Sequence, residues 1–157
     1  MTEIDWDDPA EPKTDWVREH VARYVATDGE SGHDWRGTTT LLLTTVGRRS
    51  GKPHRTALIY GQDGDRYVVV ASKGGHPRHP WWYENLVAHP EVRVQVWGDV
   101  FQARARTAGF EERPRLWELM TERWPAYDDY QARTDREIPV VVLERLAPPA
   151  NASASAT

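Results

Sequence analysis

Short apolar segments separated by turns that contain Gly, Pro or Asp dominate the middle of the chain. Such segments occupy residues 38–46, 55–62, 65–71, 91–97, 100–107 and 138–146, and they predict six β-strands. The dipeptides Asp63-Gly64 and Gly98-Asp99 lie between neighbouring segments and indicate tight hairpins. No repeated strand–helix unit of the kind that builds a parallel sheet is evident. The pattern therefore predicts a small antiparallel barrel.

Helical spacing of apolar residues occurs in four other segments. The first runs from a cap at Thr14 or Asp15 to residue 26, and its polar face mixes charges of both signs. This mixture favours a helix that covers the core, with peripheral membrane contact as the alternative. Pro80 suits the first position of a helix ending near residue 88. Two more helices are predicted at residues 110–124 and 127–134. Pro114 should delay or distort the start of the first of these two helices.

Composition limits the number of domains and the kinds of chemistry. The 157 residues contain no cysteine and carry a net charge of −4, which excludes disulfides and thiolate chemistry and argues against a nonspecific nucleic-acid coat. We expect a flexible acidic N-terminus at residues 1–13, one domain at 14–147 and a disordered tail at 148–157. No apolar run approaches the roughly 20 residues that span a bilayer. We expect a cytoplasmic protein and leave its oligomeric state open.

A basic turn stands out between the first two predicted strands. No Asp or Glu occurs between Asp34 and Asp63, although the chain has 24 acidic residues. Gly47 and Gly51 bracket the turn, so that its backbone N–H groups can form an anion nest. Arginine side chains add bidentate contacts to phosphate or carboxylate. A small polyanion is the predicted ligand, and a solvated basic turn is the alternative. The cations of this interval are Arg36, Arg48, Arg49, Lys52 and Arg55.

Four blocks of the sequence resemble the deazaflavin (F420)-dependent nitroreductase and quinone reductase family. They are Thr-Thr-Val-Gly-Arg-Arg-Ser-Gly-Lys-Pro at 44–53, Val-Val-Ala-Ser-Lys-Gly-Gly at 69–75 with Pro-Trp-Trp-Tyr-Glu-Asn-Leu at 80–86, Trp-Pro-Ala-Tyr-Asp-Asp-Tyr-Gln at 124–131, and Thr-Asp-Arg-Glu-Ile-Pro-Val at 134–140. The resemblance covers residues 38–146 in order and spacing. It implies a mainly β (α+β) fold, namely a split antiparallel β-barrel of about six strands with covering helices, similar to the FMN-binding split barrel.

The resemblance also implies the residues of the site. The phosphate and oligoglutamate tail of coenzyme F420 would lie against Arg48, Arg49, Ser50, Gly51, His54, Arg55, Thr56, Ala57 and Leu58. The deazaflavin ring would contact Val70, Ala71, Ser72, Lys73, Trp81, Trp82, Tyr83, Glu84 and Asn85. The acceptor would contact Trp124, Tyr127 and Tyr130, with Ser72, Tyr127 and Tyr130 as catalytic hydroxyls. The family usually has Arg at position 54, Pro at 57 and Tyr at 124. Arg55 offers a substitute charge, but strand alternation turns its side chain to the opposite face.

The implied reaction is hydride transfer from reduced F420 to an electron-poor acceptor, which is a quinone, a nitroaromatic compound or an activated enone. The alternatives are an FMN-dependent oxidoreductase on the same barrel and a noncatalytic deazaflavin-binding protein. A nucleic-acid module that uses the basic turn is the least favoured. His76, His79 and His89 have no carboxylate at a supporting spacing, so no metal site is predicted. Asp135-Arg136 is interpreted as an ion pair or a ligand contact.

Overall fold

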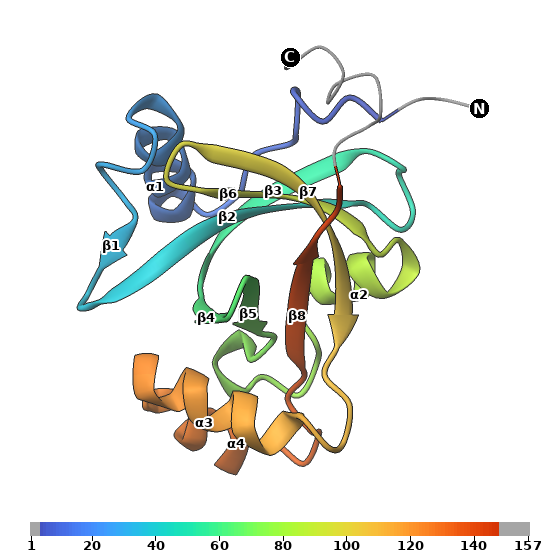
Figure 1. The fold of residues 1–157 in the computed structure, drawn as a ribbon. Helices are drawn as coiled ribbons and strands as arrows, with labels where there is room; N and C mark the ends of the chain where they lie inside the picture. Colours follow the sequence, from blue (N-terminus) through green and yellow to red (C-terminus); the bar gives the residue numbers. More distant parts are fainter. Residues whose placement is uncertain (1–3, 148–157) are drawn as a thin grey trace.

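The computed structural model describes residues 4–147, in which the strands form one curled antiparallel sheet (Figure 1). The sheet order is β1-β2-β6-β7-β8-β5-β4, and β3 pairs with β2. All six predicted strands are confirmed within this sheet. The strands are β1 (Asp34–Trp35), β2 (Thr38–Val46), β3 (Pro53–Ile59), β4 (Gly61–Asp63), β5 (Arg66–Val70), β6 (Glu91–Val96), β7 (Asp99–Thr107) and β8 (Val140–Arg145).

The strand predicted at residues 55–62 is divided in two by a bend at Tyr60. On one side of the bend β3 pairs with β2, and the Tyr60 N–H donates to the Thr39 carbonyl at 3.0 Å. On the other side Gly61 pairs with Val68 of β5. The chain thus passes from one half of the barrel to the other within a continuous apolar segment. The apolar pattern is the same on both sides of the bend, so it does not reveal the change of partner.

The two predicted hairpins are present, but each turn is shifted by one residue. Asp63 pairs with Arg66, and Val96 pairs with Asp99. The turn residues are therefore 64–65 and 97–98 rather than 63–64 and 98–99. Trp97 adopts a positive φ of 55° in the second turn. The two-residue strand β1 was not predicted because it is too short to show an alternating pattern.

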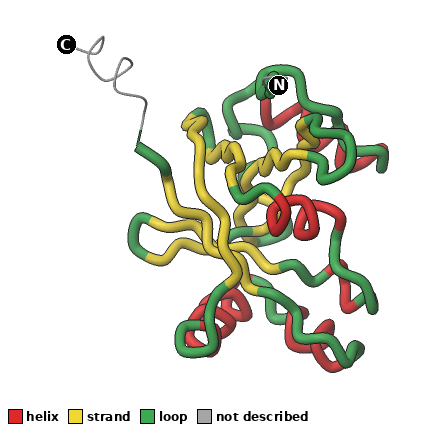
Figure 2. The backbone as a smooth tube through the Cα atoms, turned by 90° about the vertical axis from the view of Figure 1, so that its right-hand side faces the viewer, coloured by secondary structure: helices red, strands yellow, loops and turns green. Residues whose placement is uncertain are grey.

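Four helices confirm the four helical predictions, and they lie to the right of and below the strands in the view of Figure 2. They are α1 (Asp15–Ala26), α2 (Trp81–Ala88), α3 (Arg113–Arg123) and α4 (Ala126–Ala132). Pro114 lies in the first turn of α3, which starts three residues later than residue 110, as the missing proline N–H allows. A short 3-10 turn, η1 (Lys73–Gly75), follows β5.

The helices cover different parts of the sheet. Val21 and Tyr24 of α1 are buried against Leu42 of β2. The apolar face of α1 is thus used as core cover, the favoured reading of the sequence. Leu116 and Met120 of α3 pack in a second cluster with residues of β5 and β8. A third cluster fills the barrel interior. Of the helices between residues 4 and 147, none combines the length and apolar character needed to cross a membrane.

Residues 4–13 run beside β3 and make specific contacts that the sequence did not predict. The Arg55 N–H donates to the Ala10 carbonyl at 2.9 Å, and the Ala10 N–H donates to the Pro53 carbonyl at 2.9 Å. Glu11 and Asp7 form ion pairs with Arg55 and Arg93. These contacts place the segment next to the cavity described below. The proposed domain limits stay a prediction, and residues 148–157 lie outside the described part.

Candidate functional site

A cavity of about 1000 Å³ lies between the sheet, the N-terminal segment and the covering helices. The structure brings most of the predicted site residues to its lining: Arg48, Arg49, Ser50, His54, Arg55, Thr56, Ala57, Leu58, Val70, Ser72, Lys73, Trp81, Trp82, Asn85, Trp124, Tyr127 and Tyr130. Gly51, Ala71, Tyr83 and Glu84 are not among the lining residues. Residues far apart in the sequence, from the basic turn to α4, therefore meet at one site.

The basic turn closes on itself and leaves a small polar cradle. The Gly51 N–H donates to the Gly47 carbonyl at 2.8 Å, and the Lys52 N–H donates to Ser50 Oγ at 3.1 Å. Ser50 Oγ lies 3.3 Å from His54 Nε2. A Cβ at Gly47 would come within 2.4 Å of Ser50 Oγ and 3.0 Å of His54 Nε2. Glycine at position 47 therefore keeps this space open between a hydroxyl and an imidazole.

Helix α2 fixes Arg48 in the same turn. Glu84 forms an ion pair with Arg48 at 2.7 Å. Asn85 Oδ1 accepts hydrogen bonds from the Arg48 backbone N–H at 3.1 Å and from its guanidinium at 3.2 Å. Arg49 is exposed, and within residues 4–147 no carboxylate lies at ion-pair distance from it. Glu84, predicted as a cofactor contact, is thus paired with Arg48, whereas Arg49 has no such partner among the described residues.

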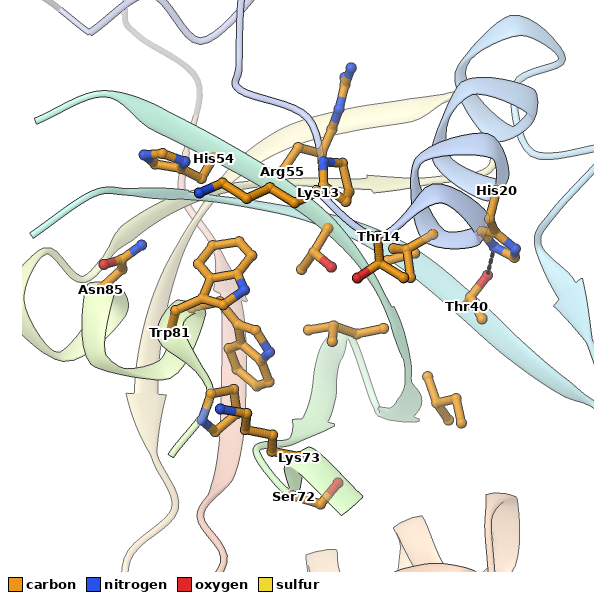
Figure 3. A pocket seen from close by; sticks show the side chains of 18 of the residues that line it. Lys13, Thr14, His20, Thr40, His54, Arg55, Ser72, Lys73, Trp81 and Asn85 are labelled. Carbon is orange, nitrogen blue, oxygen red and sulfur yellow. Dashed lines mark hydrogen bonds between the residues drawn. The ribbon is translucent and has the colours of Figure 1, made fainter. Parts of the chain in front are cut away.

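Lys13 of the N-terminal segment and Arg55 both line the cavity, but their charged groups point in different directions. Arg55 forms an ion pair with Glu11 and points away from Trp81 in Figure 3, as strand alternation predicts. The ammonium group of Lys13 extends toward His54 and Trp81 in the same view. Sequence reasoning missed Lys13 because it lies in an acidic segment with no local motif. Only the packing of that segment on β3 brings it to the site.

The three consecutive aromatic residues of α2 point in different directions. Trp82 is 5% exposed and belongs to the barrel core, whereas Trp81 is 41% exposed. The Trp81 ring meets the His54 ring edge to face, with centroids 6.0 Å apart. Tyr83 turns to β7, where its hydroxyl lies 2.8 Å from Thr107 Oγ1. Of the three, Trp81 thus offers the most accessible aromatic surface to a flat ring in the cavity.

The segment that carries Ser72 and Lys73 is held by Arg136. The guanidinium donates to the backbone carbonyls of Ala71 at 3.2 Å, Ser72 at 2.6 Å and His76 at 2.8 Å. It also lies 3.1 Å from His79 Nδ1. This finding replaces the ion pair or ligand contact expected for Asp135-Arg136, because the forked donor is used on the carbonyls of the loop.

The contact with Arg136 also determines the protonation of His79. A guanidinium can only donate, so His79 Nδ1 must accept and the imidazole is neutral. Burial lowers the pKa of His79, and the neighbouring charge of Arg136 lowers it further. His76 lies in the same loop, whereas His89 caps α2. Across the described residues, no three side chains of the metal-ligating types gather at one point.

Helix α4 packs directly against this loop. A Cβ at Gly75, where φ is 82°, would lie 2.7 Å from the Tyr130 carbonyl oxygen, so glycine permits the close approach. The Trp124 indole N–H donates to the Tyr130 hydroxyl oxygen at 3.3 Å, which leaves the hydroxyl proton of Tyr130 free for another acceptor. Tyr127 is 5% exposed, and burial raises the pKa of its hydroxyl. Of the two tyrosines, Tyr130 is the more accessible hydroxyl.

The cavity lining also contains a histidine that sequence reasoning missed. His20 of α1 is 4% exposed, and its Nε2 lies 3.3 Å from Thr40 Oγ1 (Figure 3). Thr40 donates its own proton to the Gly32 carbonyl at 2.7 Å, so His20 Nε2 must be the donor in their contact. Burial lowers the pKa of His20. Other lining residues that sequence reasoning missed include Thr14, Trp16, Val17, Trp35 and Ile59.

A cationic turn, an exposed indole and a set of hydroxyls around one cavity in a split barrel define a class of protein, the split-barrel oxidoreductases that hold a flat, anionic cofactor. The comparison with known families makes this specific. The chain belongs to the F420H(2)-dependent quinone reductase family, whose model matches residues 16–145. The resemblance found in the sequence and the split-barrel fold are thereby confirmed.

Individual relatives agree with this assignment. The chain is 44% identical to an F420H(2)-dependent quinone reductase of Mycobacterium tuberculosis (strain ATCC 25618 / H37Rv) over 133 residues. This aligned region covers 82% of this chain and 89% of the relative. A solved structure described as an F420-H2 dependent reductase matches with a TM-score of 0.63 and 43% sequence identity. The match covers 69% of this chain and 95% of the chain in that structure. Another, described as a domain-swapped dimer, has a TM-score of 0.66 and 42% identity, with coverages of 85% and 100%.

Proposed function

We propose that this chain reduces quinones with reduced coenzyme F420. The observation that carries the proposal is that a cationic turn and an aromatic, hydroxyl-bearing region open into one cavity in a chain of this family. The cavity volume of about 1000 Å³ lies at the upper end of the range for small-molecule sites. That volume supports a site shared by a cofactor and an acceptor.

The donor set of the cavity suits a flat ring that carries a polyanionic tail. Arg49, Lys13 and the cradle of Ser50 and His54 would hold phosphate and carboxylate groups through charge-assisted contacts. Trp81 would lie against the ring. The chemistry that reduced F420 supplies when bound is a hydride. The protein supplies orientation, exclusion of water and stabilisation of charge.

The hydroxyl of Tyr130 would serve the acceptor. During quinone reduction negative charge grows on a carbonyl oxygen, and a preorganised donor stabilises that charge most in the transition state. Tyr130 keeps its proton free because its oxygen accepts from Trp124. Ser72 lines the same cavity and provides a second hydroxyl. Tyr127 is more deeply buried, and its role as a third donor stays a prediction.

Replacing Arg49 with Ala should weaken F420 binding by about 1.5–3 kcal/mol, the usual range for a hydrogen bond to a charged group. Turnover at saturating cofactor should change little, because contacts to the tail are present before and during the reaction. The affinity is measured by titration of F420 absorbance or fluorescence at low salt. Arg55→Ala is the matched control and should have a smaller effect, since Arg55 pairs with Glu11. Equal losses for the two variants would contradict the assignment of Arg49.

The choice of cofactor gives a direct test of the proposal. The chain should bind F420 at least about tenfold more tightly than FMN, which corresponds to about 1.4 kcal/mol, because the cavity has more cations than one phosphate requires. F420 without its glutamate tail should lose part of this advantage. The measurement is parallel titration of the purified protein with reduced F420, oxidised F420 and FMN. Tighter binding of FMN would favour an FMN-dependent oxidoreductase instead.

Activity is tested by mixing the protein and reduced F420 with menadione in a single-turnover experiment. Oxidation of the cofactor that requires the protein is the expected result. Binding of F420 without turnover across a panel of quinones, nitroaromatic compounds and enones would indicate a noncatalytic deazaflavin-binding protein.

A further inference from the structure

Three tryptophans from separate elements stack in a row along the cavity, and we call this row the tryptophan bridge. Trp16 lies in α1, Trp35 in β1 and Trp124 at the end of α3, and all three line the cavity. The ring centroids of Trp16 and Trp35 are 6.0 Å apart with planes inclined by 9°. Those of Trp35 and Trp124 are 5.6 Å apart with planes inclined by 30°. Both distances suit offset stacking.

The tryptophan bridge connects two covers of the barrel that otherwise pack on different strands. The buried face of α1 packs on β2 and β3, whereas α3 and α4 pack on β5 and β8. In Figure 1 the β1–β2 turn projects between α1 above and α3 below. Trp35, the middle member of the row, comes from this projecting turn. The bridge therefore joins α1 to the α3–α4 cover along one side of the cavity.

Trp35 is held in place by its neighbours in the chain. His33 is buried and stacks on Trp97 with centroids 3.8 Å apart. Its Nε2 lies 2.8 Å from the Tyr60 hydroxyl. The Arg36 guanidinium lies 4.8 Å from the centroid of the Trp35 ring. These contacts fix the chain on both sides of Trp35 and support the position of its ring.

We propose that the tryptophan bridge sets the size of the acceptor, so that the cavity favours compact, flat quinones with one ring or two fused rings over quinones with a bulky aromatic substituent. This inference rests on the proposed function and adds a limit on its substrates. A substituent that reaches the bridge has to separate indole rings that are in contact. The favourable stacking between these rings is then lost. Trp35 is the residue on which the limit depends most, because both contacts of the row involve its ring.

The test compares two acceptors with the same reactive ring, menadione and 2-methyl-3-benzyl-1,4-naphthoquinone. The measured quantity is the ratio of kcat/KM for the benzyl compound to that for menadione, because intrinsic reactivity cancels between variants. Trp35→Ala should raise this ratio about tenfold or more relative to the wild type, in the range seen when a pocket limit is removed. Trp16→Ala should raise it about threefold.

Trp6→Ala is the matched control. Trp6 is also an indole with a cationic neighbour, since Arg93 lies 5.9 Å from its ring centroid, but it does not line the cavity. The ratio should stay at the wild-type value in this variant. An unchanged ratio in folded Trp35→Ala, or an equal loss for both acceptors, would overturn the proposal. If Trp35→Ala does not fold, the ratio measured for Trp16→Ala tests the proposal by itself. Trp16 is 57% exposed, so its replacement should leave the fold intact.

A second measurement separates this inference from the proposed function. The affinities of both quinones are determined by equilibrium dialysis against the same variants, which requires no turnover. A wild-type protein that binds quinones but does not oxidise reduced F420 would contradict the proposed function alone. The affinity ratio would then still test the bridge, and equal ratios in wild type and Trp35→Ala would overturn it.

Discussion

Tyr130→Phe is expected to slow the hydride-transfer step by roughly 10–100-fold, somewhat less than the usual cost of losing an oxyanion donor because Ser72 or water can substitute. The variant keeps the ring and removes the hydroxyl proton that remains free when Trp124 donates to the Tyr130 oxygen. The affinity for F420 should stay nearly unchanged, because the tail site lies at the basic turn. Single-turnover oxidation of reduced F420 by menadione measures the rate, and titration measures the affinity.

Tyr127→Phe is the matched control for this prediction. It removes a hydroxyl from the same helix at a position that is 5% exposed. The expected change in rate is about twofold or less, because the buried hydroxyl contributes less to an acceptor in the cavity. The melting temperature distinguishes a catalytic role of Tyr130 from a structural one. A structural role would lower stability and rate together, and a wild-type rate in Tyr130→Phe would remove it from the list of catalytic donors.

Arg136→Ala is expected to destabilise the protein by about 2–4 kcal/mol, because it removes one donor that serves three carbonyl groups, those of Ala71, Ser72 and His76. For a chain of this size the melting temperature should fall by roughly 5–15 °C. The rate with menadione should also fall at temperatures where the variant is fully folded, because Ser72 and Lys73 lose their anchor. Arg136→Lys keeps the charge but not the forked geometry, and should be intermediate.

Arg115→Ala serves as the control for the loss of an arginine. Arg115 forms two hydrogen bonds with Asp63 at a site away from the loop, so Arg115→Ala should lower stability without moving the pKa of His79 or slowing the reaction of the folded protein with menadione. The titration of His79, followed by NMR, gives an independent readout. Burial and the charge of Arg136 lower the pKa of His79, so its contribution to stability is present above about pH 6.5 and is lost as the pH falls through the lowered pKa. In Arg136→Ala the pKa of His79 should rise toward its ordinary value, and an unchanged pKa would contradict the proposed contact.

Local patterns were sufficient to predict most elements of this fold. Alternation of apolar residues and the chemistry of short turns depend on neighbours in the chain, so the six strands, the four helices and the basic turn could be read directly. The bend at Tyr60 could not, because a strand that changes partner keeps the same apolar pattern on both sides. The one-residue shifts of the two hairpin turns arise similarly, since register depends on the partner strand as well as on the turn dipeptide.

The sequence by itself determined the family, the class of cofactor and the cationic turn, because these depend on residue types at fixed local spacings. Only the tertiary structure decided which charges reach the cavity, placing Lys13 inside, pairing Arg55 with Glu11 and pairing Arg48 with Glu84. It also decided that tryptophans 16, 35 and 124 form one row. Such contacts join segments that are distant along the chain. Their partners are chosen by packing, which no local periodicity encodes.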